Sequence, residues 1–173
     1  MDMDHFLYFA YGSNLLSTRL MAAKRCPSAL SLGLASLASR RLKWHKPSKK
    51  DGSTKCDIVP AAMESIVHGV LYQIPSAERP ALDREEGLGK GYDALTVSVL
   101  HNRNMVQAVT YCATLTDPML KPWSWYRALV IAGAKEHGLP APYVKALSEV
   151  AAGIDPDEKR HNENMALIPE AYR

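Results

Sequence analysis

Several features that would assign this chain to a specialised class are missing from its sequence. It has three cysteines among 173 residues, and these form neither a CxxC pair nor a zinc-binding spacing. No apolar stretch approaches the ~20 residues of a transmembrane helix, and the acidic N-terminus lacks the basic region of a secretory signal. These absences argue against a disulfide scaffold and a membrane partner, and they favour a soluble protein of the reducing cytoplasm.

The signatures of several common enzyme classes are also missing. No pair of histidines has the spacing of metal ligands, so no metal site is expected. The sequence has no Gly-x-Ser-x-Gly elbow, no Walker loop and no dinucleotide-binding glycine pattern. Any chemistry must therefore come from a less familiar arrangement of side chains.

Composition predicts one ordinary globular domain over residues 1–173. Hydrophobic residues make up 47% and charged residues 23%, so the chain can bury one sizeable core. The net charge of +3 has a local origin, because seven basic residues lie between Arg40 and Lys55. Such a cluster fits a solvated loop better than a nucleic-acid site, since no aromatic-interleaved RNA motif accompanies it.

Hydrophobic patterning predicts a mixture of strands and helices. The predicted strands are several short pieces within 30–44 and the segments 6–11, 58–63, 66–72, 92–100 and 105–114, the last two forming a hairpin. The predicted helices are 15–20 with Asn14 as N-cap, a segment through Leu82 to Glu86 with Ser76 as N-cap, 125–136 and 142–150. The stretch 43–55 is predicted to be a loop, and 151–173 a polar tail on the surface. Because the elements do not alternate regularly, the pattern indicates an α+β fold.

The turn Tyr11-Gly12-Ser13-Asn14 is the first candidate for function. A strand that ends in Gly-Ser and leads into a helix leaves backbone N–H groups without partners, and glycine allows a ligand to approach closely. Such a turn can hold a carboxylate or a developing oxyanion. An ordinary strand-to-helix connection explains the same residues, and the pattern alone does not separate the two interpretations.

The segment Leu82-Asp83-Arg84-Glu85-Glu86-Gly87 is the second candidate. Glu86 lies four residues after Leu82, so both can face inward on one side of a helix. Burial beside apolar side chains would raise the pKa of the Glu86 carboxyl and make it a usable general base. A solvated acidic helix end is the competing interpretation.

Three segments together resemble one family. Residues 6–15, Phe-Leu-Tyr-Phe-Ala-Tyr-Gly-Ser-Asn-Leu, closely resemble the N-terminal signature of γ-glutamylcyclotransferases. Residues 82–87 followed by Gly91 are similar to the second motif of that family, and residues 133–140 resemble a third segment of its main cytosolic branch. The matches occur in the family's order from Phe6 to Pro140.

The resemblance implies a small closed or nearly closed mixed β-barrel with surrounding helices, also described as AIG2-like. It implies conversion of γ-glutamyl amino acids into 5-oxoproline and a free amino acid, without a cofactor and with Glu86 as the catalytic acid/base. A small γ-glutamyl molecule is then the expected partner, rather than nucleic acid or a membrane, with a homodimer left open. The substrate-binding residues that it implies are Tyr8, Phe9, Ala10, Tyr11, Gly12, Ser13, Asn14, Tyr92, Tyr111 and Tyr126.

One position departs from the family pattern. The family commonly has a tyrosine two residues after the glycine matched here by Gly91, whereas this chain has Asp93 there and Tyr92 one residue earlier. A one-residue shift in a strand normally turns a side chain to the opposite face. Either a local irregularity returns Tyr92 to the site, or that contact is lost.

Two alternatives remain open at this stage. The same fold can act on another γ-glutamyl conjugate: a γ-glutamylamine such as the ε-linked lysine conjugate, glutathione, or a γ-glutamyl intermediate of a biosynthetic route. It can also serve as a non-catalytic binding protein, because a fold does not determine a function. The presence of Glu86 favours catalysis.

Overall fold

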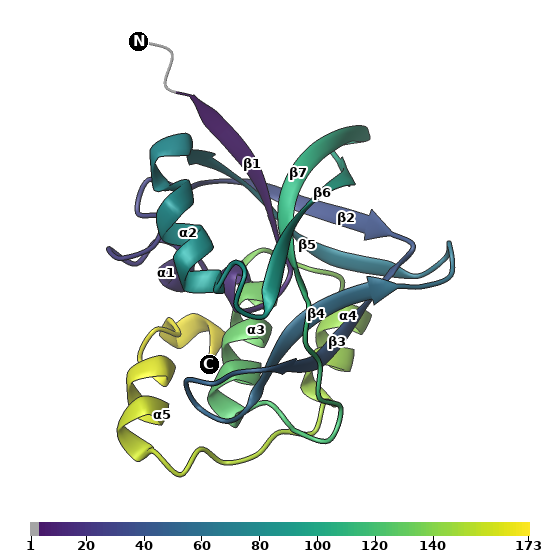
Figure 1. Ribbon diagram of the computed structural model, residues 1–173. Helices are drawn as coiled ribbons and strands as arrows, with labels where there is room; N and C mark the ends of the chain where they lie inside the picture. Colours follow the sequence, from purple (N-terminus) through teal and green to yellow (C-terminus); the bar gives the residue numbers. More distant parts are fainter. Residues whose placement is uncertain (1–3) are drawn as a thin grey trace.

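Five strands form a closed barrel in the computed structural model, which describes residues 4–173 (Figure 1). Its strands are β1 (His5–Ala10), β2 (Leu30–Ala38), β5 (Ile66–Pro75), β6 (Tyr92–His101) and β7 (Asn104–Ala113). Their order is β1-β5-β2-β6-β7, with antiparallel neighbours except for the parallel β1–β7 pair that closes the barrel. The predicted α+β class and mixed barrel are confirmed. Residues 1–3 belong to the acidic N-terminus from which the absence of a secretory signal was predicted, and they lie outside the described residues.

A separate antiparallel hairpin, β3 (Arg40–Pro47) and β4 (Thr54–Pro60), extends beyond the barrel (Figure 1). The prediction of a loop over 43–55 was therefore wrong for most of its length, since only 48–53 connect the strands. Leu42 and Trp44 pack against the core, whereas Arg41 and Lys43 are exposed. The alternation of a strand is present, but the many lysines on the solvent side conceal it.

Helices flank the barrel. They are η1 (Ser13–Leu15), α1 (Ser17–Leu20), η2 (Ser76–Glu78), α2 (Arg79–Glu86), α3 (Ser124–Glu136), α4 (Ala141–Ser148), α5 (Glu158–Met165) and η3 (Glu170–Tyr172). The central helix α3 contacts η1, α4 and α5. Within residues 4–173, no helix has both the length and the apolar character needed to cross a membrane.

Three local expectations about helices need correction. Asn14 lies inside η1 instead of capping a helix, because its side chain is engaged in the interior. Ser76 begins the short η2 and makes no capping bond, since Pro75 occupies the N-cap position. The tail contains α5, whose N-cap Asp157 accepts a hydrogen bond from the Arg160 backbone at 2.9 Å. An aspartate three residues before that N–H is a capping signal that the sequence does contain.

The packing of α3 determines where the turn after β1 lies. A Cβ atom placed on Gly133 would meet the backbone nitrogen of Leu16 and would lie 2.5 Å from Leu15 Cβ. Only glycine lets α3 approach the chain this closely. The helix therefore supports the segment that immediately follows Tyr11-Gly12-Ser13-Asn14.

Candidate active site

The turn after β1, the end of α2 and the start of α3 surround a polar cavity of about 300 Å³, which includes the open space at its mouth. The residues that line it are Tyr8, Tyr11, Gly12, Ser13, Asn14, Cys56, Glu86, Tyr92, Tyr111 and Tyr126. Five tyrosines and one carboxylate thus converge from β1, α2, β6, β7 and α3. Elements far apart in sequence meet here because the barrel closes between β1 and β7.

Glu86 is the final residue of α2, and the helix ends there because Gly87 adopts a left-handed conformation with φ 72°. Four residues earlier, Leu82 is fully buried and holds the same helix face inward. Burial raises the pKa of the Glu86 carboxyl, while the charges of Arg25, Arg19 and Lys46 oppose that rise. A carboxyl with a raised pKa can take a proton and return it, as an acid/base catalyst must.

Asn14 connects Glu86 to β1. Its amide nitrogen donates to Glu86 Oε1 at 2.6 Å and to the Tyr8 hydroxyl at 3.1 Å. Its amide oxygen accepts from Arg25 Nη1 at 3.3 Å, which determines the orientation of the amide. Arg25 also pairs with Glu85 at 3.3 Å. The Glu86 carboxyl is therefore held in a defined position facing the turn.

The turn itself offers hydrogen-bond donors. Among the described residues, the N–H groups of Gly12 and Ser13 have no backbone or side-chain acceptor. A Cβ atom on Gly12 would lie 3.2 Å from both Cys56 Cβ and the Tyr126 hydroxyl, so a larger residue would crowd the cavity wall. Free N–H groups beside a carboxylate can hold an oxyanion.

The structure resolves the question of Tyr92. Tyr92 is buried and lines the cavity, whereas Asp93 is exposed. The Tyr92 hydroxyl donates to the Cys56 carbonyl oxygen at 2.5 Å, and the Tyr126 hydroxyl accepts from the Cys56 N–H at 3.0 Å. Gly91, with φ 125°, supplies the irregularity just before the strand, in a conformation that other residues rarely adopt.

Tyr111 forms the wall nearest to α2. Its hydroxyl donates to Asp83 Oδ1 at 2.5 Å, and the same oxygen accepts from Arg79 Nε at 2.8 Å. The Tyr11 hydroxyl donates to the Tyr111 carbonyl oxygen. Burial raises the pKa of the tyrosine hydroxyls in this cavity, notably Tyr8 and Tyr11, so these groups remain protonated donors.

Nine of the eleven site residues predicted from the sequence line this cavity. Phe9 and Ala10 do not, because both are fully buried in the core and the Phe9 ring packs where Gly69 leaves room on β5. Alternation along β1 places Phe9 on the face opposite Tyr8, whereas Ala10 shares the face of Tyr8 but is enclosed in the core. Cys56 was missed, and no sequence pattern marks it. No metal-binding group of three or more His, Cys, Asp or Glu residues occurs in the part of the chain that the structure describes.

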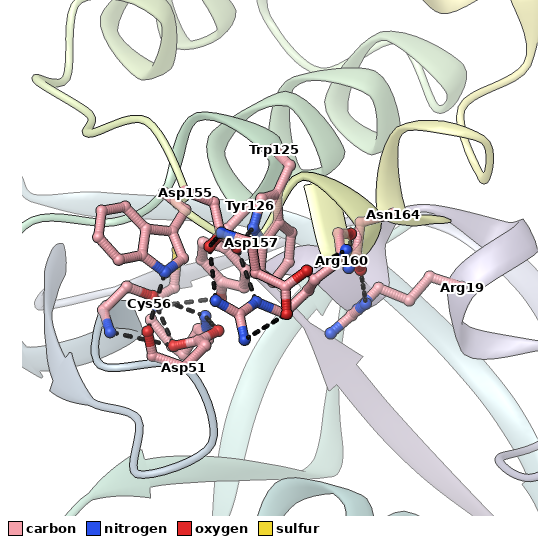
Figure 2. A network of polar contacts seen from close by, with 12 residues as sticks. Arg19, Asp51, Cys56, Trp125, Tyr126, Asp155, Asp157, Arg160 and Asn164 are labelled. Atoms are coloured by element: carbon pink, nitrogen blue, oxygen red, sulfur yellow. Dashed lines mark hydrogen bonds and ion pairs between the residues drawn. The ribbon is translucent and has the colours of Figure 1, made fainter. Parts of the chain in front are cut away.

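A wider groove continues outward from the cavity and shares Ser13, Glu86, Tyr92 and Tyr126 with it. One wall comes from the C-terminal segment, whose Arg160 bonds to buried Asp155 at 2.5 and 2.7 Å (Figure 2). Asp155 also accepts from Trp125 Nε1 at 2.7 Å, which ties this wall to α3.

The opposite wall comes from the β3–β4 hairpin. Lys55 bonds to Asp51 at 2.6 Å and lies 4.6 Å from the Trp125 ring centroid. The partly buried Glu86 carboxyl thus lies at the inner end of a groove open to larger molecules.

Comparison with known proteins identifies similar sequences and a similar solved structure. Residues 66–147 match the AIG2-like family. Bovine gamma-glutamylcyclotransferase is 31% identical over 153 residues, which cover 86% of this chain and 80% of the bovine protein. The human gamma-glutamylcyclotransferase is 30% identical over 154 residues, with the same coverage. A solved structure named gamma-glutamyl cyclotransferase superimposes with a TM-score of 0.84 and 26% identity, covering 94% of this chain and 99% of that one.

Proposed function

The chain belongs to the γ-glutamylcyclotransferase family, and from this premise we propose that Glu86 is the acid/base of a reaction releasing 5-oxoproline from γ-glutamyl amino acids. The observation that carries the assignment is the position of the Glu86 carboxyl. It is partly buried, held by Asn14 at 2.6 Å, and faces a turn with free N–H donors.

The reaction needs no nucleophile from the protein. The α-amine of the γ-glutamyl group attacks its own γ-carbonyl carbon, a five-membered ring forms, and the bond to the leaving amine breaks. Glu86 accepts the proton that the attacking amine loses and passes it to the leaving amine, so protons balance over one turnover. Holding the substrate folded supplies much of the acceleration, since well-oriented intramolecular reactions reach effective molarities of ~10⁵–10⁸ M.

The surroundings favour each step. The attacking amine must be neutral, and the cations Arg19, Arg25 and Lys46 near Glu86 disfavour a further positive charge there. The N–H groups of Gly12 and Ser13 are positioned to receive the oxyanion that forms on the γ-carbonyl. Removing one such donor from an enzyme costs about 3–4 kcal/mol of transition-state stabilisation.

The test compares two neighbouring carboxylates. Glu86→Gln should fold normally and lose 5-oxoproline release from γ-glutamyl-alanine. Glu85→Gln is the matched control, because Glu85 lies outside the inner cavity and pairs with Arg25. Full activity in Glu86→Gln, or loss confined to Glu85→Gln, would refute the assignment.

The same reasoning extends to partner and compartment. The polar lining of the cavity, with its tyrosine hydroxyls and the Glu86 carboxyl, supports a small γ-glutamyl molecule as partner, in place of nucleic acid or a membrane. Cys26, Cys56 and Cys112 are all free thiols, which supports a reducing, cytoplasmic location.

A further inference from the structure

The outer groove carries a strong excess of positive charge. Nine of its lining residues are Lys or Arg, and three are Asp or Glu. One of the three carboxylates is Glu86 itself, and the other two are paired, Asp51 with Lys55 and Glu85 with Arg25. The groove therefore retains several cations without a counter-charge beside the site of chemistry.

Lys46 is the first of these cations. Its ammonium lies 4.6 Å from the centroid of the Tyr92 ring, and Tyr92 lines both the cavity and the groove. A Cβ atom on Gly91 would lie 3.0 Å from Lys46 Cε and 3.3 Å from Nζ, so the glycine leaves room for this side chain. Among the described residues, Lys46 makes no ion pair.

Arg19 is the second. Its Nη1 donates to the Asn164 side chain at 3.2 Å, as Figure 2 shows, but its Nε is buried and has no acceptor among the described residues. A buried donor without a partner destabilises the folded protein, the more so when it is charged, and a bound anion would relieve that penalty.

The charges of Arg19 and Lys46 both influence the ionisation of Lys55 and of Glu86. The pKa of the Lys55 ammonium is lowered to about 8, chiefly by burial against the opposing effect of Asp51, with the charges of Arg19 and Lys46 contributing to the decrease. Arg19 and Lys46 also stabilise the ionised Glu86 carboxylate. Arg19 and Lys46 also line the same groove as Glu86, on the side to which the leaving amine would exit.

We propose that Lys46 and Arg19 form a leaving-group subsite that binds the carboxylate of the amine released from the γ-glutamyl conjugate. This inference rests on the proposed function, in which Glu86 protonates that amine. The carboxylate of an amino acid is one carbon from its amine, so an amine at Glu86 places its carboxylate at the groove entrance. The uncompensated charge further favours a released amino acid with a second carboxylate over one with a cationic side chain.

The first test varies the charge of the leaving group at constant γ-glutamyl part. The purified protein is assayed for 5-oxoproline release from γ-glutamyl-alaninamide, γ-glutamyl-alanine, γ-glutamyl-glutamate and γ-glutamyl-lysine. In the last compound the γ-glutamyl group is joined to the α-amine of lysine. We expect kcat/KM at least ~10-fold higher for γ-glutamyl-alanine than for its amide, the loss expected when one charge-assisted hydrogen bond is removed. γ-Glutamyl-glutamate should exceed γ-glutamyl-alanine and γ-glutamyl-lysine should fall below it, with both differences shrinking at high salt.

The second test identifies the side chains that bind the carboxylate of the leaving group. Lys46→Gln should lower kcat/KM for γ-glutamyl-alanine about 10-fold and leave γ-glutamyl-alaninamide nearly unchanged. Lys43→Gln removes the same charge from an exposed position on the same strand and should leave both substrates unaffected. Arg19→Lys keeps the charge but removes Nε and should show an intermediate loss on γ-glutamyl-alanine.

The outcomes separate the two proposals. If no conjugate yields 5-oxoproline, the proposed function fails. If the acid and the amide react equally well, the function stands and the subsite is overturned. Equal losses on both substrates in Lys46→Gln would mean that Lys46 contacts the γ-glutamyl part, which also overturns the subsite.

Discussion

Replacing Gly133 with alanine should separate the contribution of scaffold packing from that of the catalytic group. The new methyl would lie 2.5 Å from Leu15 Cβ, and ordinary van der Waals contact begins at 3.4 Å. Backbone atoms of Leu16 also block the methyl, so no side-chain rotation relieves the clash. The chain that follows the turn must move away from α3 by roughly 1 Å, the difference between those two separations.

The two expected effects differ in size. Overpacking of this kind costs about 1–3 kcal/mol, whereas alanine gains about 1 kcal/mol over glycine inside a helix, so the net destabilisation should be below about 2 kcal/mol. Catalysis should suffer more, because a misplacement of about 1 Å can reduce a rate roughly 100-fold. We therefore expect a folded protein with a severe loss of kcat/KM.

The assay combines urea unfolding with steady-state release of 5-oxoproline from γ-glutamyl-alanine. Lys135→Ala, an exposed change on the same helix, is the control and should alter neither quantity. Wild-type kcat/KM in Gly133→Ala would show that other contacts hold the turn in place, and the reasoning about α3 would be refuted.

Three further results are expected. Tyr92→Phe should lower the free energy of unfolding in urea by about 1 kcal/mol and reduce activity, since it removes the hydrogen bond to the Cys56 carbonyl. Asp93→Ala should change neither quantity, and the reverse pattern would contradict the placement of Tyr92 on the cavity side of β6. Because burial raises the folded-state pKa of Glu86, its contribution to stability is present at low pH and lost as pH rises above its ordinary value of 4.5. The melting temperature of Glu86→Gln relative to wild type should therefore increase from pH 4 to pH 7, and a constant difference would argue against that shift. Gly87→Ala should destabilise by about 1–2 kcal/mol in urea unfolding, because residue 87 has φ 72°, and an unchanged midpoint would contradict that strain.

Local sequence patterns predict those elements whose conformation depends mainly on neighbouring residues in the chain. The β6–β7 hairpin follows from two alternating runs around a polar turn, in which Asn102 and Arg103 adopt positive φ. Helix α3 likewise follows from its periodic apolar residues and from Gly138 after its end. Helix α5 and the part of the β3–β4 hairpin within 43–55 were missed because polar composition outweighed a single capping aspartate and a weak alternation.

The candidate site was predictable only in part. Resemblance to a family identified Glu86 and the turn after β1, and the physical pattern alone left both open. Cys56, Arg19 and Lys46 could not be found in this way, because they lie on segments with no common motif and approach one another only in the folded chain.

The sequence by itself determined the class of the fold and the family, and it led to the proposal of Glu86 as the acid/base, since all three depend on residue types at short spacings. The tertiary structure alone decided that Tyr92 faces the cavity, that Asn14 bonds to Glu86, and that a basic hairpin forms one wall of the groove beside the site. The physical reason is the closure of the barrel. Closure brings together β1, the end of α2 and α3, which are too far apart in the sequence for a local pattern to relate them. The pKa of Glu86 depends on the residues that surround it in this arrangement.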